Sequence, residues 1–385
     1  MIMKRIAICT LFYKNYNYGG ILQAYALQYL LRKNSFEAEV IAYDNNTNKN
    51  PIYPTLLSYC SQYSLKEIIT KILEKVYKKT NKKLQNRLSK RYALYNEFVN
   101  KNIVYTPLYS DETLVELGEK YDVYISGSDQ IWNPNAIRKL YLLEFPIKKE
   151  SLRISYAASI SRKSLDPHEI DVMLPSIAQF DHISVRERTA KILLSESGIK
   201  KTINVVCDPT ILLSARDWDN IAAPRIIQKP YVIVYAFSEI RQQQQLLEYY
   251  RNKGIECYYI PYVKNSPNSF DHKSLLKPLF DVGPAEFISL IKYAENVITD
   301  SFHGTVFSII YQKQFIVFER DKEKNRTSKN SRIYDLLEDL KLEGRLVNND
   351  FISIWSETID YTQVYSKLKQ KRDMSFQWLI NAINE

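Results

Sequence analysis

The chain has 385 residues, of which 45% are hydrophobic and 25% charged, with a formal net charge of +10. This composition is typical of a globular protein, and the length allows two domains that each bury a core. The four cysteines are far apart and form no C-x-x-C pair, so they do not indicate a disulfide framework. The four histidines are also scattered, so a dedicated metal site is not expected. The positive charge predicts attraction to an acidic partner: nucleic acid, an anionic membrane surface or a phosphorylated substrate.

No apolar run approaches the ~20 residues that a membrane span needs. The first residues, MIMKRIAICT, lead directly into an apolar strand. We therefore expect a cytoplasmic protein without a signal peptide.

The chain begins with a strand over residues 5–10, a polar loop, and a helix over residues 21–31. Gly19 and Gly20 end this loop, where they let the backbone approach the strand or a ligand closely. The glycines do not form the G-x-G-x-x-G pattern, so they are a weak nucleotide signal. We expect Asn17, Gly19 and Gly20 either to shape the loop or to line a ligand site.

The pattern changes between about residues 45 and 102, where we predict a basic helical insertion. Apolar residues from Leu65 to Val76 follow the spacing of an amphipathic helix. The accompanying basic residues are Lys66, Lys71, Lys75, Lys78, Lys79, Lys82, Lys83, Arg87, Lys90 and Arg91. This segment either covers one edge of the domain with a solvated face or lies on an anionic membrane surface. No recognised nucleic-acid-binding motif accompanies the charge, so we expect no nucleic-acid partner.

Polar turns follow the next predicted strands, which cover residues 122–126, 153–159 and 182–185. In open α/β sheets, ligands bind beyond the carboxyl ends of the strands. Asp129 and Arg186 follow two of these strands and are therefore candidate site residues. Asp129 either caps its own turn or acts on a substrate.

A strand over residues 203–206 leads into Cys-Asp-Pro, which we interpret as a crossover between domains. Alternating strands and helices then resume, with a long loop over residues 263–278 and a final amphipathic helix from about Gln363. We predict an α/β protein with two doubly wound, Rossmann-like domains facing a cleft. Residues 1–206 form the N-terminal domain, residues 207–362 the C-terminal domain, and residues 363–385 the terminal helix.

The most informative stretch is NVITDSFHGTVFSIIYQKQFIVF, over residues 296–318. It predicts a strand, a polar turn over residues 300–304, a helix over residues 305–311 and a second strand. The unpaired N–H groups at such a helix start form an anion site. His303 in the turn is a plausible acid or base for a phosphate-bearing substrate, or it caps the helix or packs beneath it.

Seven segments together resemble the polysaccharide pyruvyl transferases. These are NYGGILQAYALQ at 17–28, ISGSDQIWNP at 125–134, SYAASI at 155–160, SVRE at 184–187, CDPTILL at 207–213, DSFHG at 300–304 and SRIYDLL at 331–337. The resemblance implies a glycosyltransferase-B-like fold and transfer of the enolpyruvyl unit of phosphoenolpyruvate onto a sugar. By this resemblance the product would be a pyruvate ketal, and the reaction would require neither metal nor cofactor. Asn17, Gly19 and Gly20 would then either line the acceptor side of the site or shape their loop.

The resemblance also implies roles for individual residues. Arg186 would bind the phosphate or carboxylate of the donor, and His303 would contact the phosphate or act as acid or base. Family members that bind this donor tend to carry Arg-Leu-His where this chain has Ser301, Phe302 and His303, followed by Gly304. The missing charge leads us to expect a replacement from the following segment. The two candidates there are Arg320 and Arg332.

Two other functions remain open at this point. A nucleotide-sugar-dependent glycosyltransferase on the same fold would use the same helix start for a diphosphate. A non-catalytic membrane-surface protein would instead depend on the basic insertion. If the acceptor is a lipid-linked oligosaccharide, the insertion would place the enzyme at the cytoplasmic face of the membrane.

Overall fold

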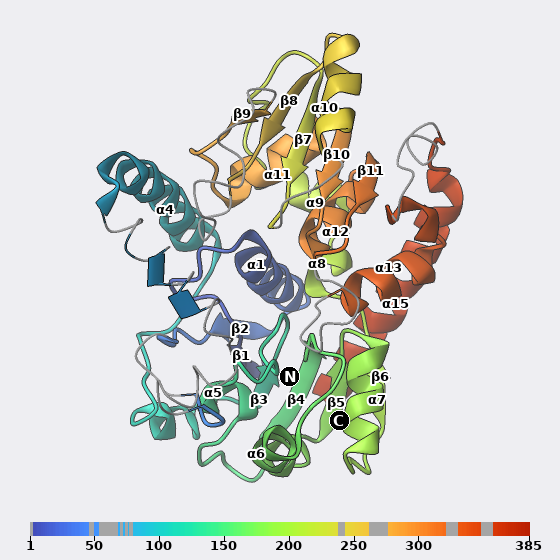
Figure 1. The fold of residues 1–385 in the computed structure, drawn as a ribbon. Helices are drawn as coiled ribbons and strands as arrows, with labels where there is room; N and C mark the ends of the chain where they lie inside the picture. The colour runs from blue at the N-terminus through green and yellow to red at the C-terminus, as the bar shows by residue number, and fades with distance from the viewer. Residues whose placement is uncertain are drawn as a thin grey trace.

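The protein is described by a computed structural model that covers residues 3–45, 50–53, 68–69, 72–73, 76, 80–237, 243–261, 276–320, 330–347 and 357–385. Its strands form two separate parallel sheets (Figure 1). The first sheet has the order β2-β1-β3-β4-β5-β6. Its members are β1 (Arg5–Cys9), β2 (Glu37–Val40), β3 (Val123–Ser126), β4 (Leu152–Ala158), β5 (His182–Val185) and β6 (Ile203–Val205).

The central strands β1 and β3 of the first sheet are short, largely apolar runs because helices cover both faces of the sheet. In β1, the four residues from Ile6 to Cys9 are fully buried. The helices of this half are α1 (Tyr18–Lys33), α5 (Lys139–Leu142), α6 (Pro167–Ile177) and α7 (Arg188–Glu196), with a 3-10 turn η1 (Leu114–Leu117). Helix α6, which the sequence analysis did not identify, begins with a capping box between Asp166 and Glu169 and with Pro167 in its first turn.

The second sheet has the order β11-β10-β7-β8-β9, and all of its strand pairs are parallel. It contains β7 (Tyr231–Tyr235), β8 (Glu256–Tyr259), β9 (Leu276–Pro278), β10 (Asn296–Thr299) and β11 (Gln314–Val317). The accompanying helices are α8 (Pro209–Leu212), α9 (Ala215–Asp219), α10 (Gln243–Asn252), α11 (Pro284–Lys292), α12 (Phe302–Ile310) and α13 (Ser331–Leu340), with a 3-10 turn η2 (Glu343–Arg345). The predicted loop over residues 263–278 is wrong at its end, because β9 pairs there with β8.

The prediction of an α/β fold with two doubly wound sheets is confirmed. Each sheet changes strand order once, between β1 and β3 and between β7 and β10. Helix α1 lies between the two sheets, where it contacts both α8 and α11 (Figure 1). The division of the chain at residues 206 and 362 stays a prediction.

The terminal helix α15 (Tyr361–Asn384) returns from the second half of the chain to the first sheet (Figure 1). The hydroxyl of Ser375 accepts a hydrogen bond from the Cys207 amide at 2.9 Å, just beyond β6. The Trp378 ring lies 6.3 Å from the ring of Tyr156 in β4. The helix therefore links the two halves, and it begins close to the predicted start at Gln363.

The insertion contains helix α4 (Lys82–Asn102), which connects both halves of the molecule. Tyr95 packs 5.1 Å from Tyr18 of α1, measured between ring centroids. The Arg91 side chain donates to the carbonyl groups of Pro261, Leu279 and Phe280 at 2.5, 3.0 and 2.8 Å. These carbonyl groups follow β8 and β9, so Arg91 joins the insertion to the second sheet.

The interpretation of the whole basic run as a solvated or membrane-facing surface is therefore wrong for Arg91, and Arg87 packs partly against the protein. Arg91 is 2% exposed, and the guanidinium of Arg87 lies 4.1 Å from the centre of the Phe280 ring. Most of the predicted helix from Leu65 to Val76 lies outside the described residues. Within the described parts of the chain, no helix combines the length and apolar character needed to cross a membrane.

Candidate active site

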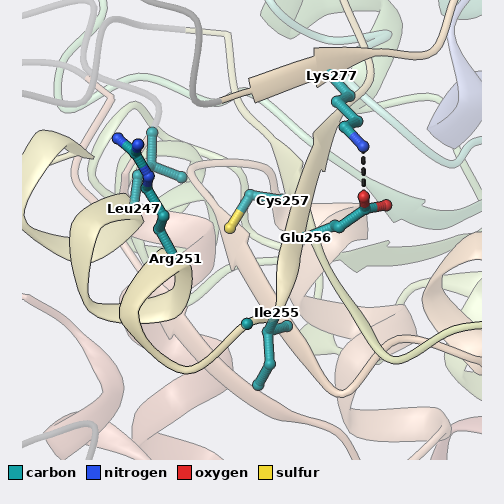
Figure 2. Close-up of a pocket in the computed structure, with 7 residues that line it drawn as sticks. Leu247, Arg251, Ile255, Glu256, Cys257 and Lys277 are labelled. Atoms are coloured by element: carbon teal, nitrogen blue, oxygen red, sulfur yellow. Dashed lines mark hydrogen bonds and ion pairs between the residues drawn. The ribbon is translucent and has the colours of Figure 1, made fainter.

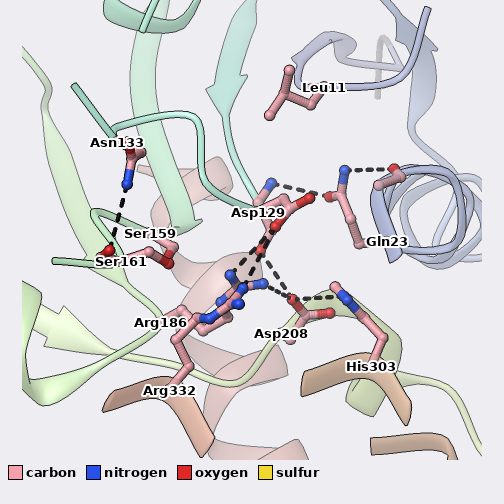
Figure 3. A network of polar contacts seen from close by, with 12 residues as sticks. Leu11, Gln23, Asp129, Asn133, Ser159, Ser161, Arg186, Asp208, His303 and Arg332 are labelled. Atoms are coloured by element: carbon pink, nitrogen blue, oxygen red, sulfur yellow. Dashed lines mark hydrogen bonds and ion pairs between the residues drawn. The ribbon is translucent and has the colours of Figure 1, made fainter. Parts of the chain in front are cut away.

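Five ionisable side chains from separate segments meet where the two sheets come together (Figure 3). They are Asp129 after β3, Arg186 after β5, Asp208 before α8, His303 in α12 and Arg332 in α13. Each is at least nine-tenths buried, and Asp208 is only 1% exposed. The fold therefore brings together all three predicted catalytic residues, Asp129, Arg186 and His303, and adds Asp208.

Asp208 is the centre of this cluster. Its Oδ1 accepts hydrogen bonds from the amide and hydroxyl of Thr210 at 3.0 and 2.7 Å. Its Oδ2 accepts from Arg186 Nη1 at 2.5 Å and from the Ser128 hydroxyl at 3.3 Å. Burial alone would raise the pKa of Asp208, but His303, Arg186 and Thr210 hold that pKa well below its ordinary value. Asp208 is therefore an ionised carboxylate that connects the two halves.

His303 lies beside this carboxylate but does not hydrogen-bond to it. The distance from His303 Nε2 to Asp208 Oδ2 is 3.7 Å, which fits an ion pair but is too long for a hydrogen bond. Nε2 is buried and has no hydrogen-bond partner. A buried polar atom without a partner carries a desolvation cost that a bound ligand would relieve.

The helix that carries His303 begins earlier than the sequence predicted. Ser301 is the N-cap of α12, so His303 and Gly304 lie in its first turn rather than in a preceding loop. The Gly304 amide donates to the Ser301 hydroxyl at 3.3 Å, and the Thr305 amide donates to the Ser301 carbonyl at 2.9 Å. From the sequence, the unpaired N–H groups of the helix start are expected to form an anion site, and the amides of Gly304 and Thr305 are not among them because both bond to Ser301. Phe302 and His303 are the first two residues of the helix, and the backbone N–H groups at a helix start are the ones able to bind an anion.

The opening turn of α1 packs against the opening turn of α12. A Cβ atom on Gly19 would lie 1.9 Å from His303 Nδ1, so glycine is required there for the imidazole to fit. Asn17 is the N-cap of α1 and accepts from the Gly20 amide at 3.3 Å. A Cβ atom on Gly20 would meet only the end of the Asn15 side chain at 2.3 Å and the Leu11 carbonyl oxygen at 3.1 Å. Gly19 thus contacts the site, whereas Asn17 and Gly20 shape the loop.

Two arginines share one aromatic ring. The guanidinium carbons of Arg186 and Arg332 lie 4.7 and 5.5 Å from the centre of the Phe302 ring. Asp129 Oδ1 is 3.4 Å from Arg186 Nη2 and 4.0 Å from Arg332 Nη1. Burial lowers the pKa of Arg332 to about 9, assisted by the positive charges of Arg186 and Arg320.

Arg320 forms the outer part of this group. Its Nη2 donates to the Asp300 carbonyl at 3.1 Å, and its guanidinium lies 3.9 Å from the centre of the Phe237 ring. The Nε atoms of Arg320 and Arg186 are both buried without a hydrogen-bond partner. The predicted replacement of the missing charge at position 301 thus has two candidates near the cluster, and Arg332 lies closer to Phe302.

Glu187 and Gln23 form hydrogen bonds that hold the loops of the cluster in place. Glu187 Oε1 accepts from the Ser159 hydroxyl and from the amides of Ile160 and Ser161, each at 2.9 Å. Gln23 accepts from the Ser128 amide at 3.1 Å and donates to the Thr10 hydroxyl at 2.8 Å. These bonds fix the loops that carry Arg186 and Asp129.

Sequence reasoning missed Asp208, Glu187 and Gln23. From the sequence, Asp208 is placed in a domain crossover and in the family segment CDPTILL, but it is given no role in the site. Its position immediately after a strand, like that of Arg186, was a signal that could have identified it. Glu187 and Gln23 carry no comparable local signal, because their roles depend on loops distant in the sequence.

A separate pocket of about 410 Å³ lies at the opposite end of the second sheet (Figure 2). It is lined by Leu247, Arg251, Gly254, Ile255, Glu256, Cys257 and Lys277. Glu256 and Lys277 form an ion pair at its edge (Figure 2). These residues lie near the amino end of β8, whereas α12 follows the carboxyl end of β10, so this pocket contains none of the predicted site residues.

The two parallel sheets with the cluster between them form a glycosyltransferase-B-like fold. UDP-GlcNAc 2-epimerase from Methanocaldococcus jannaschii is similar over 95% of this chain and 91% of its own, with a TM-score of 0.51 and 13% identity. AviGT4, a glycosyltransferase involved in avilamycin A biosynthesis, is similar over 99% and 97% of the two chains, with a TM-score of 0.51 and 10% identity. At these identities the similarity shows the fold alone.

The family model for polysaccharide pyruvyl transferase matches residues 17–322. The chain therefore belongs to the polysaccharide pyruvyl transferase family, as the seven segments indicated. No curated protein matches the chain significantly.

Proposed function

We propose that this protein transfers the enolpyruvyl unit of phosphoenolpyruvate onto two hydroxyls of a sugar in a cell-surface polysaccharide or its lipid-linked precursor. A proton adds to the donor's methylene carbon, and one sugar hydroxyl bonds to C2 and loses its proton. The bond from C2 to the phosphate oxygen breaks, which releases inorganic phosphate. The second hydroxyl then bonds to C2, loses its proton and closes the ketal. Family membership supports the reaction class, while the donor and acceptor are our proposal.

The observation that carries this proposal is a pair of buried nitrogen atoms beside the Asp208 carboxylate that have no hydrogen-bond partner. Arg186 Nε and His303 Nε2 have no hydrogen-bond partner, while Arg186 Nη1 and His303 both face Asp208 Oδ2. An anionic ester would supply acceptors to both donors. We assign to His303 the proton transfer to the methylene carbon, and to Arg186 the binding of the phosphate or carboxylate.

Arg332 supplies the second cation of the donor site in place of the charge absent at Ser301. Its guanidinium faces Phe302, the residue that follows Ser301, and lies 4.0 Å from Asp129. Arg320 lies farther out and forms an ion pair with Asp300. Asp129 orients the acceptor hydroxyl or takes its proton, since this carboxylate is the one shared by Arg186 and Arg332.

Calorimetric titration with phosphoenolpyruvate tests the donor assignment, with UDP as the control ligand. Wild-type protein and the His303→Ala variant are compared, and His182→Ala is the matched control because His182 begins β5 at the far end of the first sheet. Binding of phosphoenolpyruvate that changes only in His303→Ala supports the proposal. Binding of UDP without binding of phosphoenolpyruvate would overturn it in favour of a nucleotide-sugar-dependent glycosyltransferase.

We further propose that the enzyme works at the cytoplasmic face of the membrane, where a lipid-linked acceptor would be found. Exposed Lys82 and Lys90 on α4 and the exposed apolar side chains of Ile72 and Leu73 support this location. Sedimentation with liposomes of anionic and of neutral lipid tests it. Equal sedimentation with both would count against a role for the basic insertion in membrane binding.

A further inference from the structure

A second group of polar side chains lies apart from His303, on the loops after β3 and β4, in helix α6 and at residues 50–53. Arg162 Nη1 donates to Glu169 Oε1 at 2.6 Å, and the Tyr53 hydroxyl donates to the same oxygen at 2.9 Å. Glu169 is fully buried, and Arg162 is 5% exposed. The Tyr53 amide in turn donates to Asn50 Oδ1 at 3.0 Å.

These contacts continue into a closed ring. Asn50 Nδ2 donates to the Pro134 carbonyl at 2.8 Å. The Asn135 amide donates to Asn133 Oδ1 at 3.1 Å. Asn133 Nδ2 reaches the carbonyl groups of residues 160 and 161 at 2.8 and 3.4 Å, the second of which is drawn in Figure 3. Residue 161 directly precedes Arg162, so the chain of contacts returns to its starting point.

The ring leaves particular polar atoms without partners. Arg162 Nε and Nη2 are both buried and unpaired, and so is Asn135 Oδ1. Other arginines within the described residues, Arg138, Arg153, Arg186 and Arg320, leave only Nε unpaired in this way. Nε and Nη2 lie on the same edge of the planar guanidinium and form a fork that matches two neighbouring oxygen atoms.

The charge around this fork indicates which oxygen atoms it would bind. Glu169 at 2.6 Å already balances the charge of Arg162, so the fork does not require an anion. The unpaired Asn135 oxygen requires a donor, which a hydroxyl group supplies and a carboxylate or phosphate oxygen does not. The half-buried ring of Tyr53 adds an apolar face beside these polar groups. Neighbouring hydroxyls on a sugar ring match all three features.

We propose that the ring formed by Asn50, Tyr53, Asn133, Asn135, Arg162 and Glu169 is a carbohydrate subsite, in which the Arg162 fork binds two neighbouring sugar hydroxyls. The identification of this sugar as the acceptor rests on the proposed function, whereas sugar binding itself does not. The same two loops carry Asp129 and Ser159 of the first cluster. A sugar bound here would therefore contact the same loops that carry part of the first cluster.

Saturation-transfer NMR with a panel of simple methyl glycosides tests this subsite without any donor. The panel contains methyl β-galactopyranoside, methyl α-mannopyranoside, methyl β-glucopyranoside and methyl β-glucuronide. The Arg162→Lys variant keeps a positive charge beside Glu169 but loses the fork. Arg153→Lys is the matched control, because Arg153 in β4 leaves only its Nε unpaired.

We expect at least one neutral glycoside to bind wild-type protein and Arg153→Lys equally, and to bind Arg162→Lys about tenfold more weakly because two hydrogen bonds are lost. Undiminished binding to Arg162→Lys would overturn the proposal. Binding of the glucuronide alone would also overturn it, since the subsite would then select an anion.

Two further measurements separate this inference from the proposed function and from misfolding. Phosphoenolpyruvate binding should be the same in Arg162→Lys and wild-type protein. If wild-type protein does not bind phosphoenolpyruvate, the proposed function is wrong, but the result for sugar binding still stands. If Arg162→Lys does not fold, wild-type crystals soaked in the glycoside that binds provide the test. Sugar oxygens at Arg162 Nε and Nη2 would support the subsite, and water alone at these atoms would overturn it.

Discussion

The imidazole of His303 occupies the space that a side chain on Gly19 would need. Residue 19 belongs to the first turn of α1, beside the first sheet, and residue 303 to the first turn of α12, beside the second. The proposed proton-transfer residue of one half is therefore positioned by the backbone of the other half. The correct placement of His303 depends on the packing of these two helix starts.

Replacement of Gly19 by alanine should reduce activity more than stability. The new Cβ would lie 1.9 Å from His303 Nδ1, so the imidazole must move. A displacement of about 1 Å of a catalytic group costs about a hundredfold in rate. We expect kcat to fall by that order, while circular dichroism shows a folded protein.

Gly20→Ala is the matched control for that variant, since its Cβ conflicts mainly with the movable end of the Asn15 side chain. It should retain nearly wild-type kcat. Equal losses in the two variants would show that the helix start, and not the fit of His303, limits activity.

Asp208→Asn should lower kcat without weakening donor binding. The substitution removes the negative charge beside His303 Nε2 and weakens the contact that holds Arg186 at 2.5 Å. Loss of a group that orients and balances a catalytic imidazole costs about a hundredfold or more in kcat. Arg186 loses a competing carboxylate, so the dissociation constant of phosphoenolpyruvate should stay equal or decrease. Calorimetry and initial-rate kinetics check this, and a parallel loss of binding would indicate a purely structural role.

Donor binding should weaken as the pH rises through the pKa of Arg332, which burial and the neighbouring Arg186 and Arg320 lower to about 9. Below that pH the guanidinium is charged in the free protein. Above that pH the Arg332 guanidinium is neutral in the free protein, whereas a bound anion favours its charged form. Binding of the anion must then be accompanied by uptake of a proton, and it becomes weaker as the pH rises. Calorimetry between about pH 7.5 and about pH 10, in two buffers of different ionisation enthalpy, measures both effects.

Arg332→Gln provides the comparison for this pH dependence. It should bind phosphoenolpyruvate more weakly near neutral pH and should show a smaller decline at high pH. An unchanged decline would assign the pH dependence to another group.

Replacement of Arg91 by methionine should destabilise the whole molecule. Three carbonyl groups after β8 and β9 would lose the donor that Arg91 supplies from α4. Buried acceptors left without partners cost about 3 kcal/mol in the free energy of unfolding. Urea denaturation measures this loss, and Lys90→Met, at an exposed position on the same helix, should change the free energy of unfolding by less than about 0.5 kcal/mol. Equal values for the two variants would contradict the assignment.

Local sequence patterns predicted much of the fold. Apolar runs identified most strands within one or two residues, because a strand buried between helix layers requires continuous apolar side chains. Helix starts were less accurate. Both α1 and α12 begin about three residues before the predicted position, since glycine and histidine in a first turn do not follow the apolar period that marks a helix.

The sequence by itself determined the two-sheet architecture, the polar turns at strand ends and the family, because these depend on residues close together in the chain. Only the tertiary structure decided which turns meet. It placed Gly19 under His303, set Asp208 between His303 and Arg186, and buried Arg91 although its exposed neighbour Lys90 carries the same charge. The physical reason is that each of these contacts joins segments far apart in the chain, and their partners are defined only when the two sheets pack against each other.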